Sequence, residues 1–226
     1  GDIDLDFLSL PEGRDRYGAS RKKKKKTMEM VSAFLVQNRF QEETLRVYYP
    51  NKSIFNLPNP IVLPTAANDG TERSGALWIG KLDSNKNPLA LIRLANTLPH
   101  LRITMVANPA ELELENEVLR SMPSNIHLIR SLPYSETQAL MAKAAVHLST
   151  AWQEGFPNTF LEAAVVKTPT VSLHVDPDGR MAEGLFGFCA QGDEVHFAEQ
   201  VRRVVEQIQP IKSMMDATEK FVQENH

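Results

Sequence analysis

Residues 146–175 read VHLSTAWQEGFPNTFLEAAVVKTPTVSLHV, and three parts of this stretch predict three successive elements. Val146–Ala151 and Thr170–Val175 are short, mainly apolar runs that favour strands. Between them, Thr159–Lys167 follows a loop with a glycine and a proline and has the apolar spacing of a helix. A strand, a helix and a second strand in this order predict two parallel strands joined by a crossover helix.

The same alternation continues on both sides of this stretch. From Ala76 onward, apolar runs typical of strands alternate with segments of helical spacing. The further strands are expected at Ala76–Leu82, Arg102–Ala107, Ile126–Leu132 and Gly187–Ala190, and the further helices at Leu89–Leu98, Glu111–Arg120, Ser135–Ala145 (with Ser135 as N-cap) and Glu194–Ile208. Such strands indicate a parallel sheet covered on both faces. We therefore predict an α/β fold with a doubly wound, Rossmann-like parallel sheet over about residues 75–208.

The N-terminal part of the chain has a different character. A strand at Ala33–Gln37, a helix at Arg39–Tyr49 and a strand at Ser53–Asn56 are expected there, which is too little for a second complete doubly wound domain. The proline-rich Leu57–Pro64 and the polar Thr65–Gly75 then predict an interdomain linker. Residues 1–62 are accordingly interpreted as a truncated N-terminal remnant with its linker, and residues 63–208 as the Rossmann-like domain.

The last segment predicts one more helix. Ile211–His226 follows Pro210 and places several apolar residues on one helical stripe. A domain that ends near Ile208 has no need of this stripe. We therefore expect residues 209–226 to form a helix that packs back on the N-terminal remnant.

The composition is that of a globular protein, with 226 residues, 42% of them hydrophobic and 23% charged. The formal net charge of −3 argues against a nucleic-acid partner held by bulk positive charge. No apolar run reaches the roughly 18 residues of a membrane helix, and Asp2, Asp4 and Asp6 stand where a signal peptide would be basic. We expect a cytoplasmic protein. The run Lys22–Lys26 leaves two interpretations open: a solvated basic segment, which is favoured, or a peripheral contact with the inner face of the membrane.

Polar residues collect where the expected strands end, which is the edge at which open α/β sheets bind ligands. Gly80, Lys81 and Lys86 close the strand at Ala76–Leu82 or follow it, and the loop after Val146–Ala151 leads into the helix that holds Glu162. Two lysines and a helix N-terminus favour a multiply charged anion, and glutamates accept hydrogen bonds from hydroxyls. A diphosphate together with hydroxyls suggests a nucleotide sugar. The sequence contains no dinucleotide or Walker fingerprint, and its six histidines and single cysteine lack the spacing of a metal site.

Three motifs in this region carry a resemblance. Glu154–Ala163 reads EGFPNTFLEA, Ile79–Lys86 reads IGKLDSNK and Thr168–Leu173 reads TPTVSL. They resemble the E-x7-E motif, the G-[RK]-L-x3-K loop and the G-x-P-V-V-A strand of the family-four retaining glycosyltransferases, which have the GT-B fold of two Rossmann domains. Leu45–Ile61 is similar to the end of that family's N-terminal domain. The resemblance covers about residues 30–208 and identifies mainly the C-terminal, donor-binding domain.

The resemblance implies transfer of a sugar, with retention, from a UDP- or GDP-linked donor to an unknown carbohydrate or lipid-linked acceptor. The implied catalytic residues are Glu154, which would orient the transferred sugar, and Lys81 and Lys86, which would neutralise the diphosphate. The implied donor-binding residues are Gly80, Arg130, Gly155, Phe156, Pro157, Asn158, Thr159 and Glu162, with Glu162 on the ribose. No metal or other cofactor is implied. Because most of the family's N-terminal domain is missing, we expect the chain alone to transfer little sugar and to self-associate through exposed apolar surface.

Simpler interpretations stand beside these roles. Thr159 and Glu162 fit a capping box, Lys81 and Lys86 fit ordinary surface lysines, and Arg130 fits a solvent-facing strand end. Three further residues are expected in the core: His147, His174 and Cys189. For the whole chain, two alternatives stay open: a non-catalytic nucleotide-sugar-binding or interaction module on the same fold, and a related enzyme such as a sugar-nucleotide epimerase.

Overall fold

The computed structural model describes residues 8, 13, 19–63, 73–206 and 211–226. They form two compact units, Gly1–Pro60 and Ile61–His226, here called the N-terminal and the C-terminal unit. The sequence placed this division after residue 62. Most of the polar stretch Thr65–Gly75, the acidic residues Asp2, Asp4 and Asp6, and residues 207–210 lie outside the described residues.

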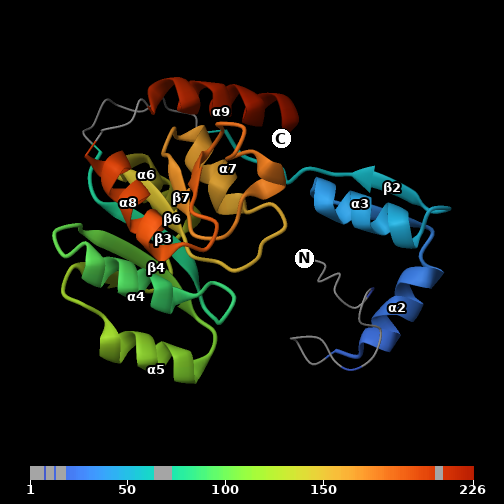
Figure 1. Ribbon diagram of the computed structural model, residues 1–226, viewed down its shortest axis with the longest axis horizontal. Coiled ribbons are helices and arrows are strands. Elements are labelled where there is room, and N and C mark those ends of the chain that lie inside the picture. The colour runs from blue at the N-terminus through green and yellow to red at the C-terminus, as the bar shows by residue number, and fades with distance from the viewer. Residues whose placement is uncertain (1–7, 9–12, 14–18, 64–72, 207–210) are drawn as a thin grey trace. The chain divides into compact units, whose positions relative to one another are not determined.

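The C-terminal unit contains a six-stranded sheet (Figure 1). Its strands are β3 (Ala76–Leu82), β4 (Ile103–Pro109), β5 (Ile126–Ile129), β6 (Val146–Ser149), β7 (Thr170–Ser172) and β8 (Gly187–Cys189). All of them pair in parallel, in the spatial order β5-β4-β3-β6-β7-β8. The chain starts in the middle, winds outward to β5, returns to β6 beside β3 and winds outward again. The predicted doubly wound sheet is therefore confirmed, with its switch point between β3 and β6.

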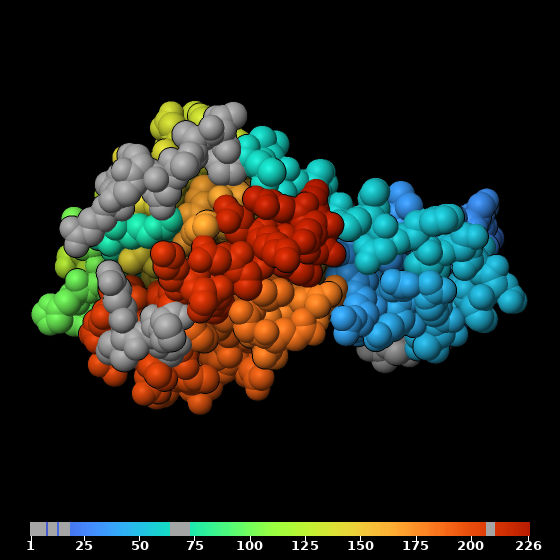
Figure 2. All heavy atoms as spheres, turned by 90° about the horizontal axis from the view of Figure 1, so that it is seen from above, coloured from blue at the N-terminus to red at the C-terminus, as the bar shows by residue number. Residues whose placement is uncertain are grey.

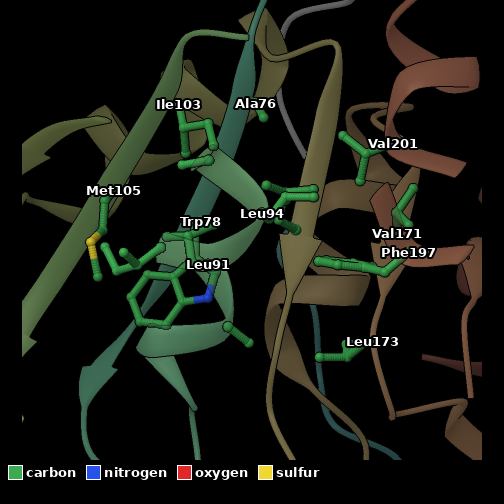
Figure 3. Close-up of a cluster of buried hydrophobic side chains, with 14 of the residues drawn as sticks. Ala76, Trp78, Leu91, Leu94, Ile103, Met105, Val171, Leu173, Phe197 and Val201 are labelled. Carbon is green, nitrogen blue, oxygen red and sulfur yellow. The ribbon is translucent and has the colours of Figure 1, made fainter. Parts of the chain in front are cut away.

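Helices cover both faces of this sheet. They are α4 (Pro88–Thr97), α5 (Leu112–Ser121), α6 (Tyr134–Lys143), α7 (Asn158–Val165), α8 (Glu194–Val205) and α9 (Lys212–Asn225). On one face, Ala76 and Trp78 of β3 lie in a cluster with residues of α4 and α8, drawn in Figure 3. On the other face, Leu77 packs with residues of α6 and α7. Successive side chains of a strand point to opposite faces, so one apolar run supplies both layers of the core.

Helix α9 packs on α7 within the C-terminal unit (Figure 1). Val222 is fully buried in a cluster with Phe160 and Phe186, and the Thr218 hydroxyl accepts a hydrogen bond from the Phe186 N–H at 2.8 Å. In Figure 2 the red atoms of α9 lie on the surface beside the orange atoms of the β7–β8 region. The apolar stripe read from the sequence is thus used at least on this side. The expected packing of α9 on residues 1–62 stays a prediction.

The N-terminal unit is smaller. It contains α2 (Arg21–Met30), β1 (Ala33–Val36), α3 (Arg39–Tyr48) and β2 (Ser53–Asn56), and β1 pairs with β2 in parallel. Helix α3 begins after Asn38, whose side chain accepts a hydrogen bond from the Gln41 N–H at 2.8 Å, the usual reason for asparagine at an N-cap. A core of Phe34, Val36, Leu45 and Tyr49 lies between α3 and one face of the strand pair.

Two predicted helix starts are wrong. Helix α6 begins at Tyr134 after Pro133, so Ser135 is not its N-cap. Helix α7 begins at Asn158 after Pro157, so Thr159 is not its N-cap. In both cases a proline sits two residues before the expected cap, and its fixed φ suits the turn that leads into a helix. No helix in the described part of the chain is long and apolar enough to cross a membrane.

Candidate functional site

The candidate site lies at the carboxyl ends of β3 and β6, where the winding of the sheet reverses direction. The loops that follow these two strands are joined by hydrogen bonds. The Trp152 N–H donates to the Asn85 carbonyl at 2.9 Å, and the Asn85 amide donates to the Gln153 carbonyl at 2.9 Å. Residues 67 and 68 positions apart are thereby held together, which favours a pre-formed ligand site.

A hydrogen-bond relay also fixes the backbone of Lys86. The Trp78 indole N–H donates to the Thr150 hydroxyl at 2.9 Å, and this hydroxyl donates to the Lys86 carbonyl at 2.7 Å. Trp78 is 1% exposed. The relay therefore starts in the core of the sheet and ends on a predicted site residue.

The structure brings Lys86 and Glu154 together as an ion pair, with side chains 27% and 12% exposed. Both side chains line a small cavity of about 10 Å³, together with Pro157 and Thr159. An ammonium and a carboxylate that are mostly removed from water interact strongly with each other and with any charged ligand nearby. The pair supplies one donor group and one acceptor group at the same place.

Two further predicted residues lie on β3. Lys81 is exposed and stands beside Asn108 of β4. Gly80 has a structural reason, because a Cβ at this position would come within 2.6 Å of the Trp78 ring.

Helix α7 starts at Asn158, at the end of the loop that holds Glu154. Its first turn contains no acidic residue, and among the described residues no side chain caps it. The positive end of the helix dipole is therefore not offset by a carboxylate in the first turn, an arrangement that favours anions. Asn158 is exposed and Thr159 is half-buried at this end.

Glu162 lies on α7, one turn after Asn158. It is half-buried, and burial raises the pKa of its carboxyl. Tyr134 lies near enough for an electrostatic effect: burial, and then the negative charge of Glu162, raise the pKa of its phenol. No described residue donates a hydrogen bond to the Glu162 carboxylate, so the capping-box interpretation is wrong. A half-buried carboxylate to which no described residue donates has a cost for the fold, and groups with a shifted pKa cluster at functional sites.

Other predicted residues are placed elsewhere. Arg130 forms an ion pair with Glu115 of α5 at 2.5 Å. The Phe156 side chain is 6% exposed and packs against Phe186, with ring centroids 6.0 Å apart. Its side chain thus serves the core of the C-terminal unit. Gly155, directly before it, is half-buried.

Of the residues expected in the core, His147 is there. It is 1% exposed, its Nδ1 lies 3.1 Å from the Thr170 hydroxyl, and burial, with a contribution from Lys86, lowers its pKa to about 3. His174 is not: it lies beyond the end of β7, half-buried. Cys189 is likewise only half-buried.

Trp152 was not among the predicted site residues, although it lies in the loop that leads to Glu154. Its indole is 58% exposed and stacks on the His174 ring, with centroids 4.0 Å apart and planes 26° from parallel. Its position two residues before Glu154 in a polar loop was the signal available. Within residues 19–63, 73–206 and 211–226, no group of three or more His, Cys, Asp or Glu side chains could hold a metal ion.

Comparisons with known proteins identify the family and the fold of the chain. The family model described as "Glycosyl transferases group 1" matches residues 73–207. A search of curated proteins found no match. Among solved structures, S. aureus TarM in complex with UDP and alpha-GlcNAc-glycerol matches with a TM-score of 0.76 at 14% identity, over 95% of this chain and 45% of that one.

Two other solved structures show the same fold. The pneumococcal O-GlcNAc transferase GtfA, in complex with UDP and GlcNAc, has a TM-score of 0.68 at 14% identity, over 88% of this chain and 43% of its own. WaaG, a glycosyltransferase involved in lipopolysaccharide biosynthesis, has a TM-score of 0.63 at 16% identity, over 84% and 58%. The chain therefore spans about half the length of the structures that it matches.

Proposed function

Because the chain belongs to the glycosyl transferases group 1 family, we propose that it binds a nucleotide sugar and supplies the donor side of a retaining sugar transfer. The acceptor in this proposal is a carbohydrate or a lipid-linked carbohydrate. The donor is a UDP- or GDP-sugar, a choice supported by the UDP in the TarM and GtfA structures.

One observation carries the proposal: the half-buried Glu162 carboxylate, which lacks a hydrogen-bond donor in the described structure, beside a helix start without an acidic residue. Two ribose hydroxyls would supply the missing donors. The diphosphate would then lie over the first turn of α7, where the helix dipole favours negative charge.

The two lysines would act on the leaving group. As the bond between the sugar and the diphosphate breaks, negative charge grows on the diphosphate. Lys81 and Lys86 would stabilise this charge in place of a metal ion, and only the part of the contact that strengthens in the transition state speeds the reaction. Glu154, now paired with Lys86, would accept hydrogen bonds from hydroxyls of the transferred sugar and so orient it.

Retention belongs to the proposal through the E-x7-E arrangement of Glu154 and Glu162. The anomeric configuration of a product, followed by proton NMR from the first turnover, tests it. A product of inverted configuration would refute this part and leave donor binding untouched.

The decisive experiment is calorimetric titration with UDP, GDP and ADP and with their sugar conjugates. Glu162→Gln should weaken nucleotide binding about tenfold or more, since a hydrogen bond to a charged group contributes about 1.5–3 kcal/mol. Glu199→Gln on the exposed side of α8 is the matched control. Equal affinities for the wild type and Glu162→Gln would refute the ribose assignment.

Lys81→Ala tests the diphosphate contact separately. It should weaken binding of a nucleoside diphosphate but leave binding of the nucleoside alone unchanged. Lys143→Ala is the control, because Lys143 is exposed at the opposite edge of the sheet, where its carbonyl accepts from the Ser74 N–H at 3.0 Å. Chelation of divalent cations should not alter the affinity, since no metal takes part in the proposal.

We propose further that this chain alone transfers little sugar. Two-domain enzymes close over the donor and exclude water before they react, and the chain spans about half the length of its structural matches. Nucleotide-sugar binding without turnover is the expected result. Complete absence of nucleotide binding would instead favour the alternative of an interaction module on the same fold.

A peripheral membrane contact is also proposed, from helix α2. Residues 21–26 are six consecutive cations at the start of this helix, which has no acidic residue in its first turn. Cations repel one another at this spacing and are unfavourable at a helix N-terminus, so an anionic lipid surface would stabilise the helix. The wild type should bind vesicles that contain phosphatidylserine and should not bind neutral vesicles. A variant with glutamine at positions 22–26 should bind neither, and these results together would support the contact.

A further inference from the structure

Trp152 presents one open aromatic face at the rim of the candidate site. The chain has two tryptophans, of which Trp78 is 1% exposed and Trp152 is 58% exposed. The other face of the Trp152 indole is covered by the His174 ring at 4.0 Å, and its backbone N–H is fixed to the Asn85 carbonyl. The ring is therefore held in position, although more than half of it faces outward.

The support under the indole is itself well packed. A side chain at position 192 would bring a Cβ to 3.3 Å from His174 Nδ1, and Gly192 has a φ of +90°, which glycine adopts without strain. The stack joins the loop after β6 to the loop after β7. An exposed tryptophan that only filled space would not need a partner ring to fix its plane.

The place of the indole indicates its ligand. Trp152 is two residues before Glu154 and does not line the small cavity around the Lys86–Glu154 pair. It thus lies outside that cavity, two residues along the chain from the carboxylate that would orient the transferred sugar. A flat, uncharged aromatic face packs well against the C–H face of a pyranose ring, because both surfaces are apolar while the hydroxyls point outward to water.

We propose that the open face of Trp152 binds a pyranose ring of the carbohydrate acceptor. The stacking itself rests on the geometry of Trp152 and His174. Only the identification of the bound ring as the acceptor rests on the proposed function, since an acceptor must lie next to the sugar that it receives.

Intrinsic tryptophan fluorescence tests the platform directly. The probes are the methyl glycosides of glucose, galactose and N-acetylglucosamine, titrated into the full chain without nucleotide. We expect a saturable change with at least one of them. It should vanish in Trp152→Phe, whose remaining tryptophan, Trp78, is buried. His174→Ala should weaken the response severalfold, because it removes the support of the indole.

One outcome would overturn the proposal: no fluorescence change with any of the three glycosides. If uridine, guanosine or adenosine then gave a change, Trp152 would be a platform for the base, since nucleobases also stack on aromatic rings.

Matched variants separate this proposal from nucleotide binding. Trp152→Ala should reduce glycoside affinity about tenfold and leave nucleotide affinity unchanged, with both affinities measured by calorimetry because this variant lacks the fluorescent side chain. Glu162→Gln should do the reverse. Phe40→Ala, which removes an aromatic ring of 62% exposure in the N-terminal unit, should change neither. Loss of nucleotide binding in the wild type with the glycoside response intact would refute the donor site alone.

Discussion

The two sheets of this protein are both parallel, but they are covered very differently. In the C-terminal unit, the central residues Leu77 and Trp78 of β3 point to opposite faces and are each 1% exposed. In the N-terminal unit, Phe34 and Val36 of β1 are buried, whereas Leu35 between them is 61% exposed and Phe55 of β2 is 56% exposed. One sheet has helices on two faces and the other has a core on one face.

This difference teaches what each unit needs in order to be stable. Parallel strands read as apolar runs because both faces are normally buried, and a pair of strands is only marginally stable by itself. The C-terminal unit has more than two paired strands and buries both faces of them with its own described residues. The N-terminal unit leaves apolar strand residues in water, which favours association with another surface.

The largest expected effect follows from separating the units. A fragment of residues 61–226 should fold and unfold cooperatively, because its core lies within one contiguous unit. A fragment of residues 1–60 should lack stable structure, since so few residues bury too little surface. Circular dichroism and amide proton NMR of both fragments would decide this. A well-dispersed spectrum of residues 1–60 would contradict the comparison.

Acid should destabilise the C-terminal unit through His147. Its pKa in the folded protein is about 3, against about 6.5 in an unfolded chain. Between these values the unfolded chain binds a proton that the folded protein does not. The free energy of unfolding should therefore fall by up to about 1.4 kcal/mol for each pH unit on acidification through this range.

The variant His147→Gln checks this pH dependence by urea unfolding at several pH values. Glutamine keeps a hydrogen-bonding group near Thr170 but has no proton to gain, so the slope between pH about 6.5 and 3 should become shallower. All six histidines follow residue 99, so the fragment 61–226 should show the same slope as the full chain. An unchanged slope in the variant would show that other groups cause the acid sensitivity, among them carboxylates and His174, whose pKa burial also lowers.

Overpacking should be costly in the six-stranded sheet. Gly80→Ala would place a Cβ within 2.6 Å of the Trp78 ring, and we expect a loss of about 1–3 kcal/mol in the free energy of unfolding. Denaturant titration measures it. Gly13→Ala, where nothing lies within 4 Å but φ is +85°, is a control for backbone strain alone and should affect the C-terminal unit not at all.

Removal of the Glu162 charge should stabilise the protein. Burial raises the pKa of this carboxyl in the folded state, so the folded protein holds a proton that the unfolded chain releases, and stability declines as the pH rises past the ordinary glutamate value. Glu162→Gln should gain about 1 kcal/mol or less at pH 7 and nothing at pH 3. The thermal midpoint at both pH values measures this, and a loss of stability at pH 7 would show that Glu162 has a structural partner.

The smallest effect on stability is expected in the two-stranded sheet of the N-terminal unit. Leu35→Ser with Phe55→Ser changes two exposed side chains, and such changes usually stay within about 0.5 kcal/mol. The same double variant should reduce self-association, measured by sedimentation. Unchanged association would place the contact surface elsewhere.

The sequence predicted the elements well because their signal is local. Apolar runs located all six strands of the C-terminal sheet and both strands of the N-terminal pair, with differences only at the ends. The sequence also placed Lys86 and Glu154 at one edge of the sheet, because both follow the carboxyl ends of predicted parallel strands. That β3 and β6 are neighbours comes from the structure.

What the sequence could not predict depends on contacts between distant residues. The Arg130–Glu115 ion pair and the burial of Phe156 against Phe186 are tertiary contacts with no local pattern. The Trp152–His174 stack joins two loops in the same way. The two wrong N-caps have another cause: Ser135 and Thr159 are good capping residues, but a proline just before each already fixed the start of the helix.

The relay from Trp78 through Thr150 to the Lys86 carbonyl has a consequence for how this sequence can vary. Position 78 lies in the middle of the core, where a volume-conserving apolar exchange is ordinarily tolerated. Here the indole N–H also orients the hydroxyl that holds Lys86. A core exchange that lacks this N–H would therefore alter the candidate site, whose small cavity Trp78 itself lines. The residues that position 78 can accept are then limited by its hydrogen bond to Thr150 as well as by packing. A redesign of the core for thermostability should therefore keep tryptophan at this position.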